Sequence, residues 1–216
     1  MARANKNKEA AIGSQNRTVS PNEAKSALTH CIKLQRPIMM WGAPGIGKSD
    51  IVKQIADTQK REVIDIRLPL WEPTDIKGIP YYNAKENNMV WASPAELPTD
   101  PKSTAIVFLD ELNSAAPAVQ AAAYQLILNR RVGQYYLPEG VSIVAAGNRD
   151  SDRGVTYRMP APLANRFVHI ELRVDYDDWM EWATTNHIHA DVVGYCTFAK
   201  QDLYDFDPRG SSRSFA

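Results

Sequence analysis

Short apolar runs of strand length recur along the chain and alternate with segments of helical periodicity. The runs lie at residues 38–41, 63–68, 105–109, 141–146 and 167–172. Between them, apolar residues return every three or four positions in residues 21–35, 48–59 and 117–130, as on one face of a helix. Ser20, Pro21 and Glu23 form a helix-start signature before the first of these segments. The pattern predicts one large α/β domain.

A different pattern follows residue 78. Residues 79–82 and 89–92 are short apolar runs on either side of the polar turn KENN, which predicts a β-hairpin. The hairpin contains Tyr81, Tyr82 and Trp91. These rings either grip a partner or pack against their own domain, and packing is the more common use of hairpin aromatics.

A glycine-rich segment, GAPGIGKS, follows the first apolar run directly and matches the phosphate-binding pattern G-x-x-x-x-G-K-[ST] at every fixed position. Glycines let backbone N–H groups surround phosphate oxygens, and the next helix presents its positive end to them. Lys48 supplies a charge for the β- and γ-phosphates, and Ser49 a hydroxyl for Mg²⁺. A chance glycine-rich turn is the alternative, which the matching strand and helix disfavour. The predicted binding residues are Gly42, Ala43, Pro44, Gly45, Ile46, Gly47, Lys48, Ser49 and Asp50.

Polar side chains end two later strands. Asp110 and Glu111 follow the run at 105–109, and Asn148 closes the run at 141–146 after one glycine. Beside a phosphate loop, the first carboxylate completes the Mg²⁺ shell and the second deprotonates the attacking water. Asn148 lies where open α/β sheets bind ligands and can hold that water. Each feature alone is an ordinary strand end or turn, but their combination with the phosphate loop predicts hydrolysis.

Composition narrows the class of protein. The 25 basic and 25 acidic side chains give no net charge, so no global field favours nucleic acid or an anionic membrane. No stretch approaches the roughly 18 apolar residues of a membrane span, and the charged N-terminus lacks the apolar core of a secretory signal. Cys31 and Cys196 are far apart without metal-type spacing, as expected for reduced thiols. We therefore expect a soluble, cytoplasmic protein.

The first 19 residues are polar and contain four basic side chains but almost nothing apolar. They predict a flexible tail, with a nucleic-acid-binding arm as the less favoured interpretation.

Together, GAPGIGKS, FLDELNSA, the helix VQAAAYQLILNRRVG and the segment ANRF resemble the AAA+ ATPases, specifically the MoxR-like branch of the helix-2-insert group. The similarity covers residues 20–172 and extends more weakly to Arg213. It implies a three-layer αβα core of the P-loop NTPase type, with a five-stranded parallel sheet in the order 5-1-4-3-2. Residues 173–216 would then begin a helical lid domain, which we expect to be truncated.

The resemblance also assigns roles to residues. Asp110 and Glu111 match the family's Walker B acids, Asn148 matches sensor 1, and Arg213 matches the sensor 2 arginine. Arg166 matches the arginine finger that reaches the γ-phosphate of a neighbouring subunit. Arg158 is the alternative finger, and capping of the next strand is the alternative role for Arg166. The expected catalytic residues are Lys48, Glu111, Asn148 and Arg166, with Ser49 and Asp110 as Mg²⁺ ligands.

Three functions remain open. The resemblance implies an ATP- and Mg²⁺-dependent motor, commonly a hexameric ring, that remodels a protein client, often with a von Willebrand factor A-domain partner. A DNA-directed AAA+ motor or loader is the second hypothesis, and the neutral net charge disfavours it. A nucleotide-gated scaffold with little hydrolysis is the third. The intact Asp110–Glu111 pair disfavours that function.

Overall fold

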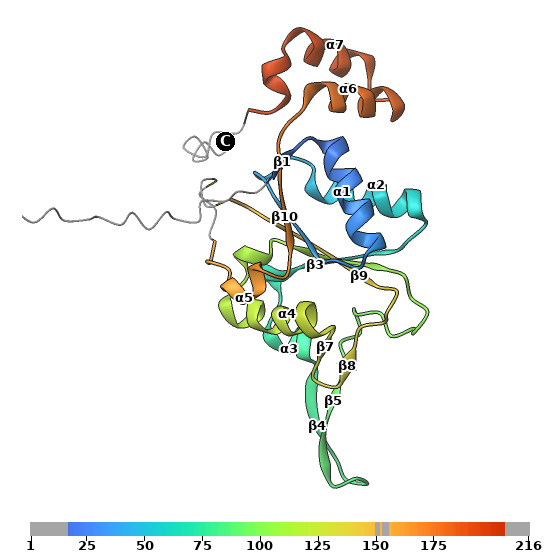
Figure 1. The fold of residues 1–216 in the computed structure, drawn as a ribbon, viewed down its shortest axis with the longest axis vertical. Coiled ribbons are helices and arrows are strands. Elements are labelled where there is room, and N and C mark those ends of the chain that lie inside the picture. The colour runs from blue at the N-terminus through green and yellow to red at the C-terminus, as the bar shows by residue number, and fades with distance from the viewer. Residues whose placement is uncertain (1–16, 150–151, 153–155, 206–216) are drawn as a thin grey trace, which may run out of the picture.

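A computed structural model describes residues 17–149, 152 and 156–205 (Figure 1). Its main sheet has six parallel strands in the order β1-β10-β2-β9-β6-β3. The strands are β1 (Arg17–Val19), β2 (Ile38–Trp41), β3 (Val63–Arg67), β6 (Ile106–Asp110), β9 (Ser142–Gly147) and β10 (Val168–Leu172). The five strands predicted from apolar runs are all present. Their order, β10-β2-β9-β6-β3, is the 5-1-4-3-2 order that the resemblance implies.

The sixth strand corrects the sequence prediction. Residues 17–19 belong to β1 and not to a polar tail, because they pair with β10 in the register Arg17–Ile170, Thr18–Glu171 and Val19–Leu172. Val19 is buried, and its carbonyl accepts a hydrogen bond from the Arg173 N–H at 3.0 Å. Such a short strand leaves no periodic pattern in the sequence. Residues 1–16 lie outside the described part of the chain.

Helices cover both faces of the sheet (Figure 1). One face packs against α1 (Pro21–Lys33) and α2 (Lys48–Gln59), and the other against α3 (Pro73–Lys77), α4 (Pro117–Asn129) and α5 (Ala161–Ala164). Adjacent residues of one strand enter opposite cores: Met40 packs with the α1–α2 side, whereas Met39 packs with the α4 side. The three-layer architecture is therefore confirmed.

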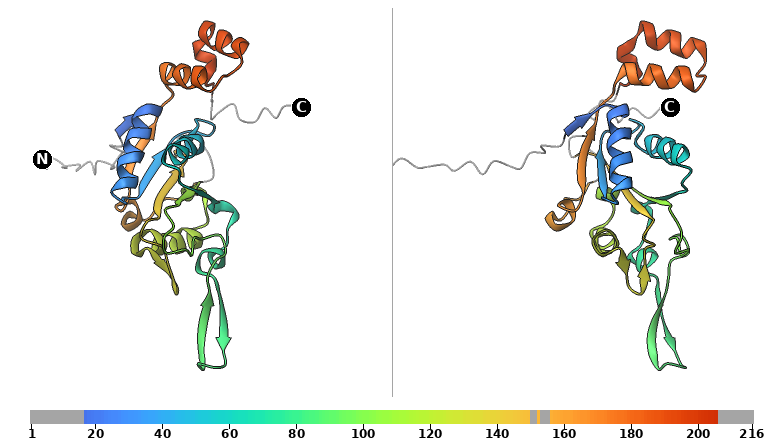
Figure 2. Two further views of the ribbon diagram at one scale, coloured as in Figure 1. Left: turned by 90° about the vertical axis from the view of Figure 1, so that its right-hand side faces the viewer. Right: turned by 45° about the vertical axis from the view of Figure 1, so that its right-hand side comes forward.

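The predicted hairpin is present as β4 (Ile79–Asn83) and β5 (Asn88–Ala92), and it projects away from the core (Figure 2). Tyr81 and Tyr82 are exposed, whereas Trp91 is half-buried close to Gly133. Packing against its own domain therefore applies to Trp91, whereas contact with a partner applies to Tyr81 and Tyr82. A second, smaller hairpin consists of β7 (Arg131–Val132) and β8 (Tyr135–Tyr136).

The chain continues beyond the sheet into α6 (Tyr176–Thr185) and α7 (Ala190–Phe198), which lie at the end of the molecule opposite the β4–β5 hairpin (Figure 2). Three short 3₁₀ helices complete the described elements: η1 (Leu68–Leu70), η2 (Leu112–Ser114) and η4 (Lys200–Leu203). The helix α6 docks on the start of α1, where Asn22 donates hydrogen bonds to Asp178 and Glu181. None of the described helices is both long and apolar enough to cross a membrane. Both cysteines, Cys31 and Cys196, are buried and unpaired.

Candidate functional site

The glycine-rich segment forms a loop between the end of β2 and the first residue of α2. Gly45 and Gly47 have φ values of +74° and +92°, a left-handed conformation that residues with a Cβ seldom adopt. The Gly42 N–H donates to the Gly147 carbonyl at 3.2 Å, which ties the loop to β9. The loop therefore wraps around the start of α2, as a phosphate-binding backbone requires.

The Lys48 side chain is folded into this loop. Its ammonium group donates to the Gly42 carbonyl at 2.8 Å, the Ala43 carbonyl at 3.0 Å and Asn148 Oδ1 at 3.3 Å. Burial lowers the pKa of Lys48, and nearby carboxylates, Asp110 first among them, oppose that shift. The ammonium group is thus held inside the loop by neutral oxygens, which an anionic ligand can replace with stronger charge-assisted bonds.

Asp110 is a nearly buried carboxylate at the carboxyl end of β6. It accepts hydrogen bonds from Ser49 Oγ at 3.3 Å and from the Glu111 N–H at 2.9 Å. A hydroxyl and a carboxylate side by side are hard oxygen donors, so Ser49 and Asp110 fit the Mg²⁺ that the resemblance implies. Glu111 has φ +54°, a strained conformation for a residue with a side chain.

These groups line one pocket of about 280 Å³. Its walls are Pro44, Gly45, Gly47, Lys48, Ser49, Asp50, Asp110, Glu111 and Asn148, all of them predicted site residues. Gly42 and Ala43 are buried below the loop and supply the carbonyls that hold Lys48. The structure therefore brings the predicted phosphate, metal and water ligands to one place.

Asn113 is a site residue that sequence reasoning missed. It is 2% exposed, its Nδ2 donates to the Asn148 carbonyl at 2.8 Å, and its Oδ1 accepts from the Asn148 N–H at 3.2 Å. A Cβ on Gly147 would lie 2.5 Å from Asn113 Oδ1, so this packing requires glycine there. The only signal in the sequence was its place in the FLDELNSA motif, and a position three residues after Asp110 does not by itself predict a role in the site.

Arg149 anchors the loop that follows Asn148. Its guanidinium forms ion pairs with Asp152 and Glu171, each at 3.0 Å. The hydrogen bond to Asp152 raises the pKa of Arg149 most, and the bond to Glu171 adds to this rise. The network joins this loop to β10 at the same edge of the sheet as the pocket.

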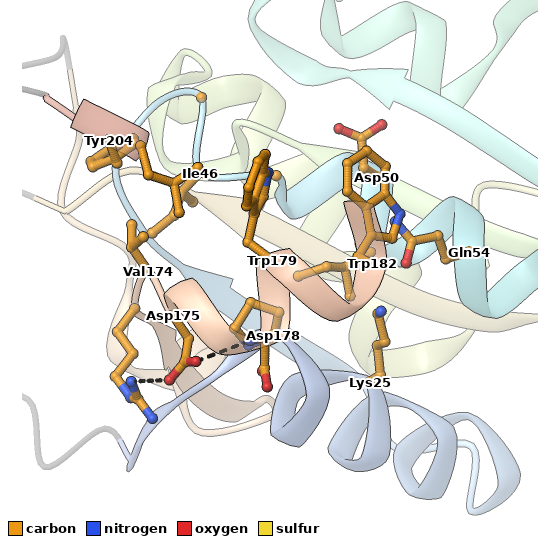
Figure 3. Close-up of a pocket in the computed structure, with 16 residues that line it drawn as sticks. Lys25, Ile46, Asp50, Gln54, Val174, Asp175, Asp178, Trp179, Trp182 and Tyr204 are labelled. Carbon is orange, nitrogen blue, oxygen red and sulfur yellow. Dashed lines mark hydrogen bonds and ion pairs between the residues drawn. The ribbon is translucent and has the colours of Figure 1, made fainter. Parts of the chain in front are cut away.

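A second pocket of about 250 Å³ borders the same loop (Figure 3). It shares Gly45, Gly47 and Asp50 with the first pocket, so the two are neighbours at the loop. Ile46, Trp179 and Trp182 contribute apolar surface, and Tyr204 Oη donates to the Pro44 carbonyl at 2.9 Å. The helix α6 therefore forms one wall of a cavity next to the phosphate loop.

The predicted arginine finger, Arg166, lies away from this pocket. Arg166 is exposed, and β10 starts beside Ile38, at the amino end of β2. The length of β2, about 13 Å at 3.3 Å per residue, therefore separates the Arg166 turn from the phosphate loop. Arg158 is exposed too, and neither arginine makes a side-chain hydrogen bond or ion pair with the described residues. Arg213 lies outside the described residues.

Known proteins resemble this chain in sequence and in fold. Residues 37–169 match the model of the ATPase family associated with various cellular activities (AAA). A curated relative, midasin of Giardia intestinalis, is 28% identical over an alignment of 186 positions, and the match covers 82% of this chain but only 4% of midasin. A solved structure from Cytophaga hutchinsonii, described as a candidate ATPase, superposes with a TM-score of 0.57 at 22% identity. That match covers 80% of this chain and 52% of the other.

Proposed function

Because the chain belongs to the ATPase family associated with various cellular activities (AAA), we propose that its pocket binds ATP with Mg²⁺ and hydrolyses the γ-phosphate. The observation that carries this proposal is the meeting of Lys48, Ser49, Asp110, Glu111 and Asn148 in one pocket at the start of α2. Family membership alone implies nucleotide binding. The second carboxylate and the amide beside the loop support hydrolysis.

Each residue has a task in this mechanism. Lys48 exchanges the Gly42 and Ala43 carbonyls for phosphate oxygens, while the loop N–H groups surround the same phosphates. Ser49 and Asp110 would hold Mg²⁺, and the ion would neutralise negative charge on the phosphate groups. Glu111 accepts a proton from the attacking water. Asn148, whose backbone is fixed by Asn113, orients that water.

The second pocket fits the nucleoside part of the same ligand. It shares three lining residues with the phosphate pocket, and the rings of Trp179 and Trp182 offer apolar surface for a planar base (Figure 3). A nucleotide bound across both pockets would bridge the core and α6.

Ring assembly belongs to the same proposal. Arg166 is exposed and far from its own pocket, so as a finger it acts on a neighbouring subunit's γ-phosphate. We propose a MoxR-type motor, hexameric as is common in the family, that remodels a protein client with a von Willebrand factor A-domain protein as a candidate partner. The hairpin of Ile79–Ala92 supports a protein client over DNA, since its two charged residues, Lys85 and Glu86, cancel.

The test is the ATP hydrolysis rate per subunit, measured against protein concentration. We expect the rate to rise with concentration as rings form. Arg166→Ala should lower it by about 10³-fold, the lower end of measured finger effects. Glu111→Gln should lower it by about 10²-fold or more while nucleotide binding is retained.

Arg158→Ala is the matched control, since Arg158 is also exposed and makes no side-chain hydrogen bond or ion pair within the described chain. It should leave the rate nearly unchanged, and a large loss there would transfer the finger role to Arg158. A rate that is independent of concentration and of Arg166 would overturn the ring arrangement. If the wild-type protein binds nucleotide without hydrolysing it, the result would instead favour the nucleotide-gated scaffold.

A further inference from the structure

His169 has a fixed protonation pattern. Trp41 Nε1 lies 2.9 Å from His169 Nδ1, and His169 Nε2 lies 2.7 Å from the Ala164 carbonyl oxygen. An indole N–H can only donate and a carbonyl can only accept. His169 Nδ1 must therefore accept, and Nε2 must hold the proton and donate it to Ala164.

The orientation of the His169 ring is fixed by two aromatic neighbours as well. The Trp41 ring lies nearly coplanar with it, with the ring centroids 6.0 Å apart and the planes 12° apart, as the hydrogen bond between the two ring nitrogens requires. Phe167 meets it edge-on at 6.1 Å and is itself buried. The Phe167 ring on one side and hydrogen bonds at both nitrogens leave His169 one orientation.

This cluster joins two functionally distinct segments. Trp41 is the last residue of β2, directly before Gly42 of the phosphate loop. Ala164 is the last residue of α5, and its carbonyl also accepts from the Phe167 N–H, while Arg166 N–H donates to the Leu163 carbonyl. His169 thus caps the carbonyl end of α5 at the turn that holds Arg166.

We propose that His169 is a positioning residue for Arg166: its ring, oriented by Trp41, holds the Ala164 carbonyl and so fixes the turn that presents Arg166 to the neighbouring subunit. The inference rests on the proposed role of Arg166 as a finger. The Arg166 side chain makes no bond within the described chain, so its backbone turn determines where the guanidinium points. A misplacement of about 1 Å in a catalytic group can cost about 10²-fold in rate.

Two substitutions separate the two hydrogen bonds of His169. In His169→Asn the amide oxygen takes the place of Nδ1, which keeps the acceptor for Trp41 and removes the donor to Ala164. In His169→Gln the amide nitrogen takes the place of Nε2 and keeps that donor. Tyr135→Phe is the matched control, because it removes one side-chain bond to a carbonyl, that of Pro98, in another part of the domain.

The assay is complementation in mixed rings. A Lys48→Ala subunit lacks a working pocket but offers a finger, and an Arg166→Ala subunit has a pocket but no finger. Mixing the two should restore hydrolysis in the Arg166→Ala pockets. Each His169 substitution, and Tyr135→Phe, is then placed either in the finger-donating or in the pocket-bearing subunit.

We expect His169→Asn in the finger-donating subunit to lower the restored rate by about tenfold or more. The same change in the pocket-bearing subunit should have little effect. His169→Gln should retain most of the rate, and Tyr135→Phe should act equally weakly in both positions. A general loss of folding would lower the rate from either subunit and cannot produce this asymmetry.

Two outcomes would overturn the inference in distinguishable ways. If complementation occurs but His169→Asn acts equally in both subunits, or in neither, His169 does not position Arg166 and the proposed function stands. If the two parent variants do not complement each other, Arg166 does not act in trans, and both this inference and the ring mechanism fail.

Discussion

Side chains in this protein are fixed more by main-chain groups than by one another. Lys48 is held by two loop carbonyls, Asn113 by the N–H and C=O of Asn148, and His169 by the Ala164 carbonyl. Arg130 likewise donates to the carbonyls of Pro138 and Val141. Because backbone positions depend on the whole sheet, such bonds make the site's geometry a property of the fold.

The pH dependence of stability tests one such bond to the main chain, that of Tyr135. Its hydroxyl donates to the Pro98 carbonyl at 2.7 Å, and burial raises its pKa to about 12, with Arg130 acting in the opposite direction. The folded state therefore favours the neutral phenol. Its stabilisation is fully present below the ordinary tyrosine pKa of about 10 and is lost as pH rises from there towards 12.

We therefore expect Tyr135→Phe to unfold with about 1 kcal/mol less free energy than the wild type at pH 8, because it lacks one hydrogen bond. The difference should shrink as pH rises above about 10. Urea unfolding of both proteins at pH 8 and at pH values above about 10 measures this difference in free energy. Other groups titrate alike in the two proteins, so their contributions cancel in the difference. A difference that stays constant with pH would contradict the assignment.

At the residue scale, the sequence predicted the site residues whose position within a motif, or at the end of an apolar strand, indicates their chemical role. Lys48 and Ser49 have fixed places in a phosphate loop, and Asp110, Glu111 and Asn148 follow buried strands. Asn113 and His169 were missed because each has a partner far away in the sequence: Asn148, which follows β9, is 35 residues from Asn113, and Trp41 of β2 is 128 residues from His169. Only the sheet order brings them together.

At the scale of helices and strands, the docking of α6 on α1 is the main contact between the C-terminal helices and the core. Asn22 donates from its N–H to Asp178 at 2.8 Å, and from Nδ2 to Asp178 and Glu181, each at 3.0 Å. Both carboxylates face the positive end of α1, where negative charge is stabilising. The contact holds Trp179 and Trp182 against the second pocket.

Asn22→Ala should weaken nucleotide binding by several-fold, up to about tenfold, because it removes one side chain that holds α6 in place. The hydrolysis rate at saturating ATP should change little, since Asn22 is remote from Asp110 and Glu111. Calorimetric titration with ADP gives the affinity. The matched control is Asn186→Ala, whose amide donates only to the Trp182 carbonyl within α6. Equal losses in both variants would show that the α1–α6 contact does not govern binding.

Element prediction succeeded where burial extends over a whole strand. The strands β2, β6 and β9 are nearly continuous apolar runs because both of their faces are covered. The two-residue strands β7 and β8 and the three-residue β1 are too short to show any period. The β4–β5 hairpin was predicted because its polar turn lies between two apolar runs.

At the scale of the whole molecule, the phosphate loop lies between two projecting ends: the helices α6 and α7 on one side and the β4–β5 hairpin on the other (Figure 2). Local pattern could not predict this arrangement, because the strand order depends on crossovers between distant segments. The order came from the resemblance to a family, and the six-strand sheet confirms it with one addition at the edge.

That addition has a consequence for the behaviour of the protein in solution. The three residue pairs of β1 cover part of the outer side of β10. A chain that begins at residue 20 would leave the N–H and C=O groups of β10 open, next to the apolar Ile170 and Leu172. Open strand edges of this kind pair with the same edge of another copy. We expect deletion of residues 1–19 to cause self-association that light scattering detects, whereas deletion of residues 1–16 leaves the protein as disperse as the full chain. Three residues of an otherwise polar segment would then keep separate copies from joining their sheets.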